Sequence, residues 1–309
     1  QQCLRGGRFG GAASAFTVRL KKITEPEVEG LAGINLLSKN RREKIISAKS
    51  LTPASVSTVY YVSDEGNDAN SGAEDSPWKS ISRVNRALKE SSGSVAVCFR
   101  RGDIFRGNLA ARSNVTLTAY GIGGKPVICG SPENGAEPGR WEKVPGTENI
   151  WKYKTPLRDV GTVFFNGGSY AAKRCPSIIG GSYEYGYEAL ENLQFISAVP
   201  AGDAISLNNS NAAEKTGYLY LRCDEGNPGE IYQSVEFSER VYAISLADGS
   251  ENITIDNLCI TFGGAHGIAG SNIKNLLVQN CELSFIGGGI QKYNYDSAKN
   301  AYIPARYGN

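Results

Sequence analysis

The stretch Ile253–Phe262, with the sequence ITIDNLCITF, matches Leu276–Phe285, LLVQNCELSF, at a shift of 23 residues. A shorter motif, a small residue followed by isoleucine, also repeats around these copies, as Ala243-Ile244, Gly267-Ile268 and Gly289-Ile290. Self-similarity with a period of about 20–50 residues is typical of stacked structural repeats, so the sequence predicts coils that lie one on another. The corresponding residues are Ile253 and Leu276, Ile255 and Val278, Asn257 and Asn280, Ile260 and Leu283, and Phe262 and Phe285.

Alternation within each copy indicates short strands with one buried face. Leu258 and Ile260 are expected to point into the coil and Cys259 outward, because successive side chains of a strand face opposite sides. In the second copy the same rule places Glu282 outward, next to Cys259 of the coil before. Asn257 and Asn280 stand between strands.

An asparagine between strands can adopt a left-handed turn conformation and hydrogen-bond its neighbour's backbone. We therefore expect Asn257 and Asn280 to stack as a ladder of asparagines at one corner of the coils. A leucine-rich repeat has a similar period, but its Leu-x-x-Leu-x-Leu pattern is absent here. Coils of three short parallel strands are the favoured architecture.

The chain upstream of the repeat predicts one helix and several more strands. Ile81, Val84, Ala87 and Leu88 fall on one face of an amphipathic helix over Lys79–Lys89. Strands are expected, with turn residues between them, at Val59–Val62, Val95–Phe99, Val115–Ala119 and Val127–Cys129, and also at Val160–Asn166 and Gly217–Cys223.

Two regions differ in composition from the coils. Residues 1–56 are basic, contain a possible helix over Glu25–Lys49, and are interpreted as a leader or linker. Residues 57–309 are predicted to form the main domain, whose coils are clearest at 235–291. Within it, 138–229 is irregular and rich in tyrosine and tryptophan, and we interpret this region as a β-rich insertion.

Charge and cysteine usage exclude several functions. The 33 basic and 31 acidic side chains nearly cancel, so no long-range field draws the protein to nucleic acid. No stretch approaches the ~20 apolar residues of a membrane span. The seven cysteines contain no C-x-x-C pair, and His266 is the single histidine, which argues against a zinc site. We expect several cysteines to be small core residues.

Five segments, two of which overlap the repeat, carry a resemblance to a known superfamily. They are Tyr60–Leu88 with its GNDANSG and SPWKSI elements, FRRGDIFRG (Phe99–Gly107), TAYGIGGKPVI (Thr118–Ile128), NITIDNLCITFGGAHGI (Asn252–Ile268) and NCELSFIGGGIQ (Asn280–Gln291). The chain resembles the right-handed parallel β-helix, pectate-lyase-like superfamily, especially its carbohydrate-active bacterial members. This resemblance implies an all-β solenoid with an N-terminal cap helix. Relatives continue past a string like ARYGN (Ala305–Asn309), so we expect the chain to end within its coils.

The resemblance implies an extracellular or cell-surface protein that acts on a polysaccharide or oligosaccharide, as a monomer, by lyase or glycoside hydrolase chemistry. One alternative is a non-catalytic glycan-binding or surface-adhesion module. Another is an inactive N-terminal fragment whose catalytic coils lie beyond Asn309. Function on a shared fold has to be argued from the site.

Three residues are candidates for catalysis: Glu282, His266 and Lys292. An outward carboxylate such as Glu282 can act in acid–base chemistry, although such a residue is usually only solvated. A near-neutral pKa suits His266 to contact a sugar or to transfer a proton. Lys292, like Arg306, follows the repeat and could bind a carboxylate.

Ca²⁺ is the one cofactor that the sequence suggests. Asp64, Asn67 and Asp68, with Asn70, offer hard oxygen ligands in one loop. They depart from the EF-hand pattern, which needs a glutamate at its last position. A polar turn that caps the following helix is the alternative role for this loop.

Overall fold

The computed structural model describes residues 30–51, 56–175, 186–198, 216–298 and 301–308. Helix α1 (Gly30–Ile46) has no buried residue, and the predicted start of this helix at Glu25 lies outside the described residues. The chain divides into two units, Gln1–Arg42 and Glu43–Asn309, and the second contains all the described strands. Strands dominate its regular structure, so the all-β class is confirmed. No described helix is long and apolar enough to cross a bilayer.

Three sheets are built entirely from parallel strands. The first contains, in order, β1 (Thr58–Val62), β2 (Val95–Arg100), β5 (Val115–Tyr120), β16 (Glu251–Asp256) and β19 (Lys274–Gln279). The second contains β3 (Ile104–Arg106), β6 (Val127–Cys129), β17 (Cys259–Thr261) and β20 (Glu282–Ser284). The third contains β4 (Leu109–Ala111), β15 (Tyr242–Leu246) and β18 (His266–Ala269).

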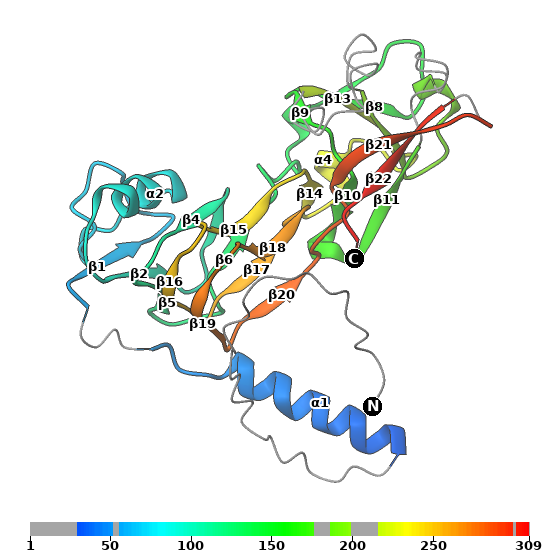
Figure 1. Cartoon of the computed structure of the whole chain (residues 1–309). Coiled ribbons are helices and arrows are strands. Elements are labelled where there is room, and N and C mark those ends of the chain that lie inside the picture. The colour runs from blue at the N-terminus through cyan, green and yellow to red at the C-terminus, as the bar shows by residue number, and fades with distance from the viewer. Residues whose placement is uncertain (1–29, 52–55, 176–185, 199–215, 299–300, 309) are drawn as a thin grey trace. The chain divides into compact units, whose positions relative to one another are not determined.

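The chain visits these three sheets in rotation, which is why residues about one repeat apart become neighbours. The predicted register is confirmed, because Ile253 pairs with Leu276 and Ile260 pairs with Leu283. Inward side chains of successive coils fill one apolar core, as β-branched and leucine residues do on a pleated surface. The parallel strands that carry these side chains lie at the left of Figure 1.

Helix α2 (Ile81–Glu90) supplies the predicted apolar face to the same core, through Ile81, Val84, Ala87 and Leu88. It begins at Ile81, two residues after the predicted Lys79, because Ser80 caps it and accepts a hydrogen bond from the Arg83 N–H at 3.1 Å. The helix packs beside β4.

Asparagines turn the chain at the corners, but the ladder lies at a different corner from the predicted one. Asn114, Asn252 and Asn275 all have positive φ, and their amides form a chain of 3.0 Å hydrogen bonds, Asn275 to Asn252 and Asn252 to Asn114. Asn257 and Asn280 also have positive φ, as predicted, but Asn257 bonds Ala48 and Asn280 bonds Asp256. The prediction of a ladder through Asn257 and Asn280 was therefore wrong, because both side chains donate to other partners and not to each other.

The predicted β-rich insertion is an eight-stranded sheet between β6 and β15, with a core of its own. Its strands are mostly antiparallel. Arg106 of β3 links it to the coils by donating to both carboxylate oxygens of Glu236, at 2.7 and 2.9 Å. The strands are β7 (Trp141–Lys143), β8 (Ile150–Tyr153), β9 (Leu157–Arg158), β10 (Thr162–Phe165), β11 (Tyr170–Arg174), β12 (Gln194–Ala198), β13 (Thr216–Arg222) and β14 (Val235–Ser238).

Short helical turns and one hairpin complete the described elements. The turns are η1 (Pro138–Arg140), η2 (Asn166–Gly168), η3 (Tyr187–Ala189) and α4 (Pro228–Ile231). Strands β21 (Ile290–Asp296) and β22 (Ala301–Arg306) form an antiparallel hairpin. Parallel and antiparallel sheets are thus mixed, and the prediction of a solenoid over all of residues 57–309 holds only at the level of the all-β class.

Candidate functional site

The three predicted catalytic residues lie on different elements. Glu282 is half-buried on β20 and pairs with Cys259, as the alternation predicted. Burial and the nearby Glu282 charge together raise the pKa of the Cys259 thiol to about 11. Lys292 is exposed on β21. No side-chain hydrogen bond within the described residues joins Glu282, His266 and Lys292, so the structure does not assemble them into one catalytic group.

His266 has the most structured surroundings of the three. It lies on β18 opposite Tyr242 of β15, and the parallel register stacks the two rings with centroids 5.6 Å apart and planes 7° apart. Tyr307 meets the imidazole edge-on at 5.2 Å. His266 is exposed and Tyr242 keeps 38% of its surface in solvent. A pair of flat rings therefore stands on the outer face of the third parallel sheet.

A pocket of about 460 Å³ lies elsewhere in the unit, whereas one of about 380 Å³ opens beside these rings. Its lining adds three polar residues to Tyr242 and His266, namely Ser245, Asp248 and Ser271. The Ser245 hydroxyl lies 3.0 Å from the Asn108 amide oxygen, and Asp248 accepts a 2.9 Å hydrogen bond from Asn272. Both groups are thus held in place while part of each remains able to bond a ligand.

Two further contacts fix the rings. The Asn108 amide donates to the Tyr242 carbonyl at 2.7 Å. The Arg240 Nε donates to the Tyr307 hydroxyl at 3.1 Å, and its guanidinium lies 5.8 Å from that ring. Backbone bonds also tie Tyr307 to Gly289. Side chains held by their neighbours lose less entropy when a ligand binds.

This arrangement suits a sugar better than an apolar ligand. A flat aromatic face packs against the C–H face of a pyranose, while a carboxylate and hydroxyls bond its hydroxyl groups. Glycoside hydrolysis needs two carboxyl groups, at about 5–5.5 or 6.5–9.5 Å. Asp248 is the one carboxylate among the lining residues. The pocket is therefore equipped for binding, and hydrolysis needs a second carboxyl group from elsewhere.

Sequence reasoning found His266 but missed Tyr242, Ser245 and Asp248. The repeated motif Ala243-Ile244 and Gly267-Ile268 already implied the link, because it places Tyr242 and His266 at equivalent positions, one residue before each pair. Asp248 could not be found in this way, since it lies in a turn and the coil before contributes no counterpart.

The loop that contains Asp64, Asn67 and Asp68 braces the start of α2. Asp68 accepts hydrogen bonds from the backbone N–H groups of Lys79 and Ser80 and from the Ser80 hydroxyl, at 2.9, 2.8 and 2.6 Å. Asn67 accepts from the Ala69 N–H, as in an Asx turn. Burial, followed by the neighbouring Asp103, raises the pKa of Asp64. No group of three or more His, Cys, Asp or Glu with metal-binding geometry occurs within the described residues.

No protein-family model matches the chain. A lacto-N-biosidase of Bifidobacterium longum subsp. longum is 36% identical over 106 residues, which cover 30% of this chain and 6% of that protein. Among solved structures, XylC in complex with xylose has a TM-score of 0.45 at 13% identity, covering 68% of this chain and 41% of that chain. A glycoside hydrolase has a TM-score of 0.42 at 12% identity, covering 66% and 50%.

A GH136 lacto-N-biosidase from Eubacterium ramulus covers 82% of this chain and 37% of that chain, with a TM-score of 0.33 and 16% identity. The chain thus spans at most half the length of the relatives that it matches. The names of these proteins refer to carbohydrates or to glycoside hydrolysis.

Proposed function

We propose that this chain is the glycan-binding, β-helical part of an extracellular glycoside hydrolase, with a right-handed, pectate-lyase-like coil. The observation that carries the proposal is the parallel stack of Tyr242 and His266 beside a pocket that contains Asp248 and Ser245. Rotation of the chain through three parallel sheets supports the coil. The names of the relatives favour hydrolysis over β-elimination.

In this proposal one sugar ring packs against the Tyr242 and His266 rings. Asp248 accepts hydrogen bonds from sugar hydroxyls, and Ser245 donates or accepts according to the hydroxyl that it meets. Arg240 acts indirectly, by holding Tyr307 against the edge of His266. The site then selects an oligosaccharide by ring shape and hydroxyl pattern.

A second candidate function is a binding module without catalysis. It is favoured by the single carboxylate among the pocket-lining residues, because hydrolysis with two carboxyl groups cannot be completed from this pocket alone. The two functions make the same prediction for binding and opposite predictions for turnover.

The test is binding and turnover of defined oligosaccharides by the 309-residue chain. Xylo-oligosaccharides, lacto-N-biose-containing oligosaccharides, pectin, alginate and chondroitin would be compared by titration calorimetry and by product analysis. Binding with new reducing ends supports a hydrolase, unsaturated products would indicate a lyase, and binding alone supports the module. Absence of binding to every glycan would overturn the proposed site.

Tyr242→Ala is the decisive variant. We expect it to weaken glycan binding about tenfold, because it removes the aromatic face while the parallel strands remain paired. Tyr218→Ala is the matched control, since Tyr218 is 39% exposed but lies on β13 of the insertion. Equal losses of affinity in the two variants would contradict a site at Tyr242.

A further inference from the structure

The second pocket, of about 460 Å³, lies beside the loop that follows β5. Residues Ser47–Ser50 form one wall, and Arg101 with Tyr120 and Gly121–Gly123 form the other. Its lining includes the cations Arg101 and Lys49 and no acidic side chain. This charge pattern is the reverse of the Tyr242 pocket, which contains Asp248.

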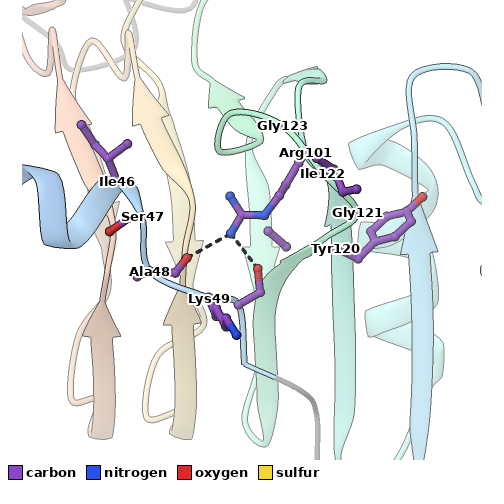
Figure 2. A pocket seen from close by; sticks show the side chains of 11 residues that line it. Ile46, Ser47, Ala48, Lys49, Arg101, Tyr120, Gly121, Ile122 and Gly123 are labelled. Atoms are coloured by element: carbon purple, nitrogen blue, oxygen red, sulfur yellow. Dashed lines mark hydrogen bonds between the residues drawn. The ribbon is translucent and has the colours of Figure 1, made fainter.

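Arg101 is held in the pocket by neutral oxygens only. Figure 2 shows its guanidinium reaching the Ala48–Ser50 segment, where Nη2 bonds the Ser50 hydroxyl at 2.9 Å and the Ala48 carbonyl at 3.4 Å. The same nitrogen donates to the Asn257 amide oxygen at 2.8 Å. No carboxylate forms an ion pair with Arg101 among the described residues, and its Nε and Nη1 have no hydrogen-bond partner there.

A second cation lies behind Arg101. Lys125 is 8% exposed, and its ammonium donates to the same Asn257 oxygen. Burial, and then the charge of Arg101, lower the pKa of Lys125, while Glu282, Cys281 and Asp256 act in the opposite direction. The carboxylate of Asp256 accepts hydrogen bonds from Leu51, Thr118, Gln279 and Asn280, and among the described residues it forms no hydrogen bond with Arg101 or Lys125.

The opposite rim of the pocket offers backbone donors. The N–H groups of Gly121, Ile122 and Gly123 have no hydrogen-bond acceptor within the described residues. Positive φ values at Gly121 and Gly123 let the loop curve with no side chain at either position. Successive free N–H groups in such a loop attract anions, and a guanidinium adds a planar pair of charged donors.

We propose that the Arg101 pocket binds the oxyanion group of an acidic saccharide, either the carboxylate of a uronic acid or a sulfate ester. The identity of the ligand as a saccharide rests on the proposed function, whereas the oxyanion chemistry rests on Arg101, the second cation behind it and the free N–H groups. Carboxylate and sulfate share the oxygens that a guanidinium recognises, so both probes test the same site.

The experiment is titration of the 309-residue chain with glucuronate, inorganic sulfate and glucose, followed by NMR or calorimetry at low salt. We expect glucuronate and sulfate to bind and glucose not to bind at this site. Arg101→Gln should weaken both anions about tenfold or more, since it removes a charged donor pair. Arg101→Lys, which keeps the charge but not the planar fork, should recover only part of the affinity.

Arg112→Gln is the control, because Arg112 is also bonded to neutral oxygens but lies outside the pocket. Failure of the wild-type chain to bind either anion overturns the proposal, whether or not the variants fold. Anion binding that survives Arg101→Gln also overturns it. Binding of neutral oligosaccharides that depends on Tyr242 but not on Arg101 tests the proposed function separately.

Discussion

Asn257 and Asn252 have nearly the same backbone conformation but lie in very different surroundings. Asn257 is fully buried, and its amide joins Arg101, Lys125 and the Ala48 carbonyl. Asn252 is exposed and forms the middle of the asparagine ladder. At the residue scale, burial decides how much each side chain contributes to stability, since a buried group that loses its partner has no water to replace it.

Asn257→Ala should therefore lower the free energy of unfolding by about 2–4 kcal/mol, and Asn252→Ala by about 1 kcal/mol. Chemical denaturation measures both. Asn257→Gly separates the causes, because glycine tolerates the positive φ but cannot supply the hydrogen bonds. A glycine variant as stable as the wild type would show that backbone strain, and not the buried amide, accounts for the loss.

Helix α2 depends on a carboxylate outside its own sequence. Asp68 holds the Lys79 and Ser80 backbone, and the Ser80 hydroxyl then caps the helix. Burial alone would raise the pKa of Asp68, but the hydrogen bonds from Ser80 and Lys79 outweigh it and hold the pKa below its ordinary value. At the element scale, the stability of the first turn of α2 should therefore depend on pH.

The sign follows from that lowered pKa. The folded protein prefers ionised Asp68, so this stabilisation is complete above the unfolded pKa of about 3.9 and is lost as the pH falls through the lower, folded value. Asp68→Asn should cost about 1 kcal/mol of unfolding free energy at neutral pH, and the difference from wild type should shrink below about pH 4. Denaturation across pH checks this.

Asp75→Asn provides the comparison for that measurement, since Asp75 is exposed and makes no described hydrogen bond. It should leave the free energy of unfolding almost unchanged at every pH. A cost for Asp68→Asn that stays constant down to strongly acid pH would contradict the link between the carboxylate charge and the helix cap.

At the scale of the whole molecule, apolar side chains are exposed on the last described strands of two parallel sheets. Strands β19 and β20 end the first and second parallel sheets, and their inward residues Leu276 and Leu283 are 41% and 50% exposed. The equivalent residues one coil earlier, Ile253 and Ile260, are fully buried. An exposed apolar strand edge is a site for pairing with another chain.

We therefore expect this 309-residue chain to self-associate as its concentration rises, in contrast to the monomer that the sequence interpretation implied. Leu283→Lys should reduce association with little loss of stability, because the lysine side chain can reach solvent from a half-exposed position. Sedimentation velocity over a concentration series tests this. A wild-type chain that sediments as a monomer throughout, indistinguishable from Leu283→Lys, would refute it.

Local patterns in the sequence were sufficient for much of the fold. The repeat from Ile253 to Phe285 predicted both the stacking and its register, because side chains one coil apart must share one core. The spacing of Ile81, Val84, Ala87 and Leu88 predicted the buried face of α2, because helical periodicity is a property of the chain itself. The insertion was recognised by composition, although the order of its strands was not.

Tertiary structure alone decided which polar groups meet. Asn257 was expected to bond a neighbouring coil, yet its amide donates to Ala48, and the adjacent Asp256 accepts from Leu51, some two hundred positions away. Likewise the sequence shows His266 only as its single histidine, whereas the structure places Tyr242 beside it in the third sheet and Asp248 in the same pocket. Periodicity encodes contacts between equivalent positions, whereas hydrogen bonds between unlike residues depend on where folding brings distant segments together.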